Sequence, residues 1–165
     1  MLKIFIGIVL LCFSFGEYLQ FLVPLAGAVI IISQLIQMRK RDAVFNISIV
    51  SAVTFAVYEV LSAILYMLPI YETANFSSYL YAGKIILGSA LLIALYSAFK
   101  NRYGRRTFGI IGLILMNVGS AAVVMLAPVF QFGYDEVTVG MAILVYAFVL
   151  GYIGTDMRMM YLSEA

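Results

Sequence analysis

The chain has 165 residues, of which 65% are hydrophobic and only 11% are charged, and its mean hydropathy is +1.09. A soluble protein of this size could not cover so much apolar side chain with so little polar surface, so lipid must be the solvent for most of the chain. The net charge is +2 and the basic residues stand in short, separate clusters, which excludes a nucleic-acid-binding protein.

Apolar segments follow one another along the chain, and short polar loops separate them. A helix needs roughly 20 apolar residues to cross about 30 Å of hydrocarbon. The long segments show no period-two alternation, so the sequence predicts an all-α integral membrane protein and not a β-barrel. The expected spans cover residues 2–16, 19–37, 44–70, 79–99, 107–130 and 138–156, which form one transmembrane helical domain across residues 1–165.

The basic residues indicate how the spans are oriented. They follow the expected spans 19–37 and 79–99, whereas the loops 72–78 and 131–137 contain no Lys or Arg. Because cytoplasmic loops carry the excess of Lys and Arg, we expect the protein to lie in a cell membrane with both termini on the cytoplasmic side. The residues that determine this topology are Arg39, Lys40, Arg41, Lys100, Arg102, Arg105 and Arg106.

The first segment is short for a span and leaves three interpretations open. Lys3, an apolar core and Ser14-Phe15-Gly16 together match the pattern of a cleaved signal peptide. An N-terminal helix lying in the membrane interface would leave five spans. A short first span would give a six-span helical bundle, which we expect because Lys3 then lies on the cytoplasmic side with the other basic residues.

One span carries an ionisable side chain near its middle, where a charge is costly and needs a partner or a role. Glu59 lies 15 residues into the span 44–70, and Lys84 lies 15 residues before Phe99. Both are therefore about 22 Å above the cytoplasmic face and can form an ion pair. Helical spacing predicts a polar seam along the face that holds Ser48, Ala52, Phe55, Glu59, Ser62 and Tyr66.

Two interpretations of this seam are open. A carboxylic acid paired with Lys84 would link two helices, and the pairing would reduce the cost of both charges. Alternatively, the pair would be a proton or cation site in mid-membrane, where the sites of transporters lie. Asn117 in the span 107–130 can form a hydrogen bond across helices. The candidate polar site consists of Glu59, Lys84, Asn117 and Ser62.

The sequence has none of the motifs that mark an enzyme. It lacks a Walker A loop and the patterns GxSxG, HExxH and CxxC, and it contains no histidine. Cys12 is the single cysteine and cannot form an internal disulfide. We therefore expect no enzymatic activity, no catalytic residue, no cofactor and no metal site.

Two functions remain, and the first is slightly favoured. The first is a non-catalytic subunit that stabilises or assembles a larger membrane complex, with lipid and other membrane subunits or further copies of this chain as partners. Ala147, Gly151 and Thr155 form a ladder of small residues that would permit such a close helix contact, inside the monomer or with a partner. The second is a small oligomeric transporter or channel for protons, cations or a small solute that uses the Glu-Lys pair.

Overall fold

The computed structural model describes residues 1–12, 19–40, 42–68, 76–104, 107–130 and 136–162, and its regular structure in these ranges is entirely helical. The all-helical class expected from the sequence is therefore confirmed. Residues 13–16 and 69–70, at the ends of two expected spans, lie outside the described part. The elements are α1 (Leu2–Leu11), α2 (Leu19–Arg39), the short 3₁₀ helix η1 (Ala43–Phe45), α3 (Asn46–Tyr66), α4 (Phe76–Tyr103), α5 (Phe108–Phe130) and α6 (Glu136–Leu162).

Three segments of the described chain are long and apolar enough to cross a membrane, namely Leu19–Arg39, Ala43–Tyr66 and Tyr79–Tyr103. Two further apolar helical segments, Leu2–Leu11 and Phe108–Gly119, are shorter in the described part. The chain thus has the helices of a membrane protein.

α3 buries three polar side chains and exposes most of its large aliphatic side chains. Ser48, Glu59 and Ser62 are buried, whereas Ile47 and Val50 are 72% and 65% exposed. Val53, Val57, Val60, Leu61 and Ile64 are also exposed along the same helix. A soluble protein rarely exposes a continuous apolar face of this kind, so the pattern indicates a helix whose outer side contacts lipid.

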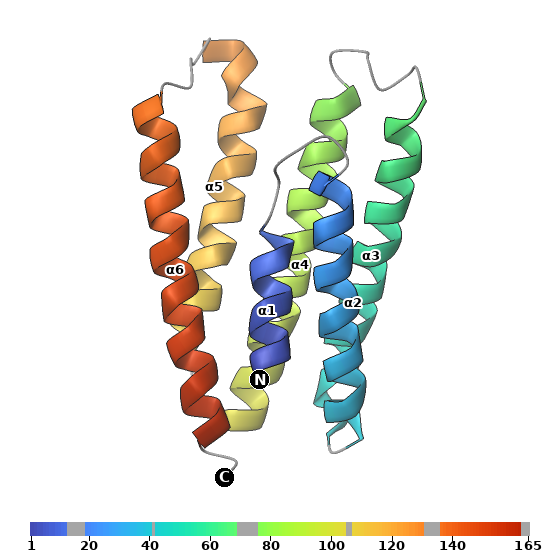
Figure 1. Cartoon of the computed structure of the whole chain (residues 1–165), viewed down its shortest axis with the longest axis vertical. Coiled ribbons are helices and arrows are strands. Elements are labelled where there is room, and N and C mark those ends of the chain that lie inside the picture. Colours follow the sequence, from blue (N-terminus) through green and yellow to red (C-terminus); the bar gives the residue numbers. More distant parts are fainter. Residues whose placement is uncertain (13–18, 41, 69–75, 105–106, 131–135, 163–165) are drawn as a thin grey trace.

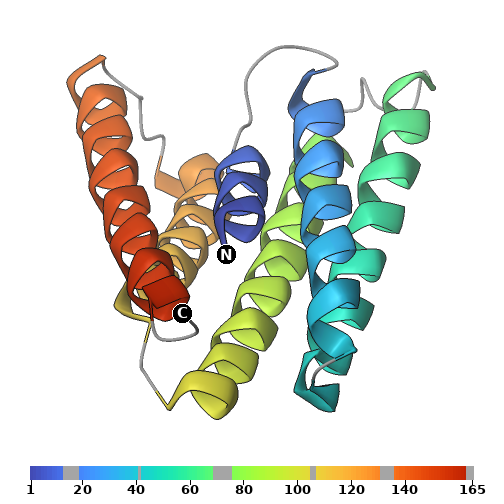
Figure 2. The same ribbon diagram turned by 60° about the horizontal axis from the view of Figure 1, so that its bottom comes forward.

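The helices form a closed circuit in which each packs against its neighbour in sequence and α6 returns to α1. Figure 1 shows the short α1 at the front, between α2 and α6, and Figure 2 shows the same order from another side. The apolar core inside this circuit receives residues from every helix, including Ile8, Leu35, Phe55, Leu95 and Ile153.

Glycines permit the closest helix contacts. A Cβ atom on Gly27 would lie 2.7 Å from the carbonyl oxygen of Gly7 and 3.0 Å from the backbone nitrogen of Leu11, so α1 and α2 pack backbone against backbone. A Cβ atom on Gly109 would lie 2.6 Å from the backbone nitrogen of Ile153. The first turn of α5 therefore packs equally closely on α6.

Polar side chains fix two of the helix ends. Oδ2 of Asp156, on α6, accepts a hydrogen bond from the backbone N–H of Gly109 at 3.1 Å, which satisfies a donor in the first turn of α5. Oδ1 of Asp42 accepts from the backbone N–H of Val44 at 3.1 Å at the start of η1. α4 is followed by Gly104, whose φ of 65° is the left-handed conformation that commonly stops a helix.

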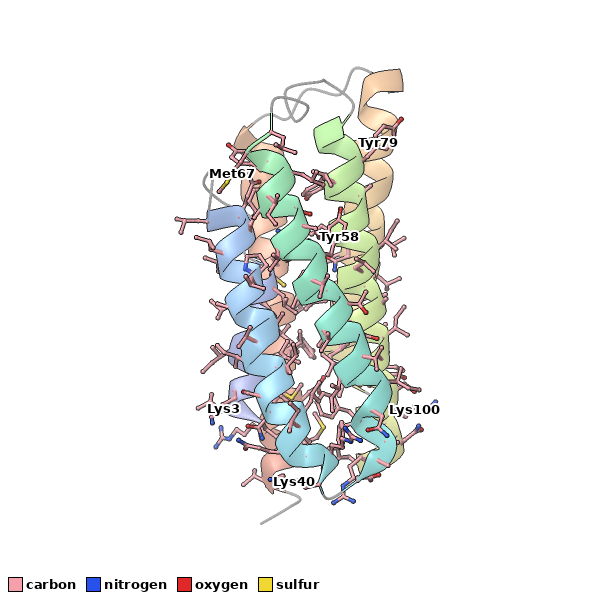
Figure 3. The ribbon with its side chains drawn as sticks, turned by 90° about the vertical axis from the view of Figure 1, so that its right-hand side faces the viewer. Lys3, Lys40, Tyr58, Met67, Tyr79 and Lys100 are labelled. Carbon is pink, nitrogen blue, oxygen red and sulfur yellow. The ribbon has the colours of Figure 1, made fainter. Side chains whose placement is uncertain are left out.

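Basic residues gather at one end of the bundle. Lys3, Lys40 and Lys100 lie there, while Met67 and Tyr79 lie at the opposite end (Figure 3). Arg39 ends α2, and Lys100 and Arg102 are in the last turn of α4. The guanidinium of Arg102 also lies 3.4 Å from the carboxylate of Asp42 and so links the end of α4 to the start of η1. Arg41, Arg105 and Arg106 lie outside the described residues.

Candidate functional site

The inward face of α3 is the polar seam that its helical spacing predicts. Ser48, Ala52, Phe55, Glu59 and Ser62 are all buried, whereas Tyr66, the last residue of the predicted seam, is only half-buried. Oγ of Ser48 donates a hydrogen bond to the carbonyl of Ala94 at 3.0 Å. The seam therefore faces α4 and the interior of the helix circuit.

Glu59 and Lys84 lie side by side across the α3–α4 interface. Nζ of Lys84 is 3.4 Å from Oε1 of Glu59, and the two side chains are 13% and 0% exposed, respectively. The same Nζ lies 6.0 Å from the centre of the Phe21 ring, a distance at which an ammonium is attracted to an aromatic face. The interior thus holds a close pair of opposite charges beside an aromatic ring.

A backbone carbonyl of α2 completes the surroundings of the ammonium. Nζ of Lys84 donates a hydrogen bond to the carbonyl of Gln20 at 2.5 Å. In a regular helix this carbonyl would accept from the N–H four residues later, but that residue is Pro24, which has no N–H. The proline therefore removes the regular helix donor to this carbonyl, and the ammonium of Lys84 donates to it.

Lys84 consequently links three helices through one nitrogen atom. Its backbone belongs to α4, its ion-pair partner belongs to α3, and its carbonyl acceptor belongs to α2. Nearby, the hydroxyl of Tyr58 donates to the carbonyl of Leu80 at 2.6 Å and closes the α3–α4 interface one turn further along. The Glu59–Lys84 pair therefore lies among polar contacts that join α2, α3 and α4.

The carboxylate of Glu59 retains unused capacity. Neither of its oxygens receives a hydrogen bond of good geometry from any residue that the structure describes, although Nζ of Lys84 lies 3.4 Å from Oε1. Buried carboxylates normally accept several hydrogen bonds, since each unsatisfied lone pair costs free energy in a medium of low dielectric constant. The two oxygens of Glu59 therefore have lone pairs that no described residue uses.

A small cavity lies next to Lys84. Its volume is about 70 Å³, which is room for a few water molecules. Lys84 and Asn117 both line it, so the cavity brings together residues from α4 and α5 that are far apart in sequence. Ser62 is buried on the face of Glu59 but does not line the cavity. The remaining lining residues include Cys12, Tyr81 and Tyr146.

The sequence did not point to the Gln20 carbonyl or to the cavity. Pro24 was the available signal for the carbonyl, because a proline within an expected span leaves the carbonyl four residues earlier without its donor. No sequence signal marked Tyr58, whose role depends on how α3 and α4 pack. In the described part of the chain, no group of three or more His, Cys, Asp or Glu residues could hold a metal ion.

In comparisons with known proteins, no family model, no curated protein and no solved structure matches this chain.

Proposed function

We propose that the chain is a six-span protein of a cell membrane, with both termini in the cytoplasm, that carries protons or a small cation through the Glu59–Lys84 site. The topology is supported by the basic residues gathered at one end of the bundle (Figure 3). The remaining three spans would be formed by α1, α5 and α6, of which α1 is the shortest.

One observation carries the proposed activity. A buried acidic side chain and a basic side chain that is 13% exposed lie together between α3 and α4, and the basic one also lines a cavity that can hold water. Ionisable residues within a membrane are costly, and they mark ion and proton pathways. A cavity of about 70 Å³ has room for the few water molecules of a proton relay or for a small cation.

Flux measurements in liposomes test this function. The purified protein is reconstituted, and proton and alkali-cation fluxes are followed with entrapped dyes under an imposed gradient. We expect Glu59→Gln to abolish the flux, because it removes the charge that a proton or cation must meet. The matched control is Thr54→Val on the exposed side of α3, where the hydroxyl donates to the carbonyl of Val50 in its own helix. Equal flux in wild type and Glu59→Gln would refute the proposal.

A second candidate is the non-catalytic subunit, and the outer face of α6 favours it. Ala147, Gly151 and Thr155 are all exposed, so the monomer leaves this small-residue ladder uncovered. A Cβ atom on Gly151 would meet nothing within 4 Å. Such a ladder permits the close helix contact that associates membrane subunits.

Mild solubilisation separates the two candidates. For a subunit, we expect partners or further copies to co-purify in fixed ratio, and Gly151→Leu to reduce that ratio. Gly119→Leu is the matched control, because Gly119 is also exposed and without neighbours within 4 Å. A homogeneous monomer without partners would refute the subunit function.

A further inference from the structure

We propose that a second cavity, at the basic end of the bundle, binds an anionic phospholipid, whose phosphate lies between Lys3 and Arg158 and whose acyl chains begin on the apolar wall between α1 and α6. Basic pockets between membrane-spanning helices bind anionic lipid headgroups in this way. The proposal goes beyond ion transport and uses no residue of the Glu59–Lys84 site.

The cavity lies where three helices come together. α1 begins there, between α2 and α6 (Figure 1). The volume is about 630 Å³, which is within the range of about 300–1,000 Å³ that is usual for small-molecule sites. The lining includes Leu2, Lys3 and Phe5 of α1, Gln34 of α2, and Gly154 and Arg158 of α6. We call this space the α1–α6 cavity.

The charges at the α1–α6 cavity are positive and available. Lys3 and Arg158 are both exposed, and neither has an ion-pair partner among the residues that the structure describes. Asp156 precedes Arg158 by two positions, so it does not share its helix face, and its carboxylate accepts a hydrogen bond from the backbone of α5. The amide of Gln34 supplies a further donor. An anion in the cavity would therefore meet two cations and a neutral donor.

Apolar side chains beside these cations indicate that the anion carries a hydrocarbon part. Leu2 lines the cavity and is 71% exposed, and Phe5 and Met157 line it as well. A free phosphate would leave these side chains uncovered. A phospholipid covers them with its acyl chains and places its phosphate at the boundary between hydrocarbon and water, where basic side chains attract it. The lining thus favours a phospholipid over a free anion.

Gly154 keeps space open in the apolar part of the cavity. A Cβ atom on this residue would lie 3.5 Å from the nearest ring carbon of Phe5, which is an ordinary contact distance. The longer side chain of leucine would extend into the space that Gly154 lines between α1 and α6. Gly154→Leu therefore obstructs the apolar part of the cavity and leaves both cations in place.

Native mass spectrometry of the full chain tests the site. The protein in a neutral detergent is titrated with dioleoyl-phosphatidylglycerol and, separately, with dioleoyl-phosphatidylcholine, which has the same acyl chains but no net charge. We expect a single phosphatidylglycerol to bind at concentrations at which phosphatidylcholine does not. Lys3→Gln with Arg158→Gln should raise its dissociation constant roughly 30-fold, since each basic residue near an anionic lipid contributes about fivefold. Gly154→Leu should also weaken binding, because the leucine overfills the cavity.

Lys40→Gln with Lys100→Gln is the matched control. It removes two exposed basic residues from the same end of the bundle but outside the α1–α6 cavity, so phosphatidylglycerol should bind as it does to wild type (Figure 3). Equal losses in the two double variants would show a diffuse attraction to the basic end and would overturn the site.

Three other results would also overturn the proposal. They are equal binding of the two lipids, binding of neither, and displacement of phosphatidylglycerol by millimolar inorganic phosphate, which would show a site for a free anion. Circular dichroism checks that each variant is folded. The two double variants change exposed side chains only, so they decide the outcome even if Gly154→Leu does not fold.

Discussion

Replacing Pro24 by alanine tests whether the proline and Lys84 act on the same carbonyl. Pro24→Ala returns an N–H to the position that would normally donate to Gln20. In wild type the carbonyl already accepts from Lys84 at 2.5 Å, so the new donor has little to add. In Lys84→Met the carbonyl has lost that donor, so Pro24→Ala should restore a hydrogen bond.

The expected coupling between the two substitutions follows from the free-energy cost of a carbonyl that loses its donor, which is about 1–3 kcal/mol when the carbonyl is buried. Because this carbonyl is only partly buried, we expect Pro24→Ala to stabilise Lys84→Met by about 1–2 kcal/mol more than it stabilises wild type. The loss of packing at Pro24 and the unpaired charge of Glu59 occur in both arms of the cycle and cancel.

The free energy of unfolding is measured by SDS titration in mixed micelles and followed by circular dichroism, since the chain has no tryptophan. Tyr58→Phe provides the matched control, because Tyr58 donates to the carbonyl of Leu80 and not to that of Gln20. The effects of Tyr58→Phe and Pro24→Ala on the free energy of unfolding should therefore be additive. If the Pro24–Lys84 coupling is also below about 0.5 kcal/mol, the two residues do not share the carbonyl and the reasoning is wrong.

Three further predictions concern stability in the same SDS assay. Glu59→Gln and Lys84→Met should each lower the free energy of unfolding by about 3–5 kcal/mol. The double variant should lose less than the sum of the two losses, because no lone charge is left. Additive losses would contradict the ion pair. Gly27→Ala should cost about 1–3 kcal/mol, because its methyl group meets the backbone of α1. Gly119→Ala, into open space, should cost nothing, and equal losses at the two glycines would contradict the close packing. Asp156→Ala should cost about 1 kcal/mol by removing an acceptor from the first turn of α5, whereas Asp156→Asn keeps an acceptor oxygen and should cost less.

The local features of the site followed from the period and rise of a helix. Residues that are three or four positions apart share one face of a helix, which places Glu59 on the same face as Ser48 and Ser62. The structure buries that face. The equal depth of Glu59 and Lys84 followed from 1.5 Å per residue on two antiparallel helices. These inferences need only the geometry of one helix and the position of the loops.

The features that depend on several helices did not follow from the sequence. Pro24 indicates a carbonyl that lacks its regular helix donor, but the side chain that donates to it depends on how α2, α3 and α4 pack. The cavity beside Lys84 depends on side chains from five helices and has no pattern in the sequence. α6 continues to Leu162, beyond the expected span 138–156, because Met157 and Met160 are buried in the core while Arg158 is exposed.

The adjacency of α3 and α4 in the chain also bears on how the protein enters the membrane during synthesis. Glu59 is made first, and a charged side chain at the centre of an isolated span opposes its insertion by roughly 3 kcal/mol. Lys84 follows 25 residues later, which is about 1–5 s of translation at ordinary ribosomal speeds. The carbonyl of Gln20 has by then been made, so every partner of the lysine is already present when α4 emerges. Because Lys84 follows Glu59 so closely in the chain, α3 lacks its neutralising partner for only this short time.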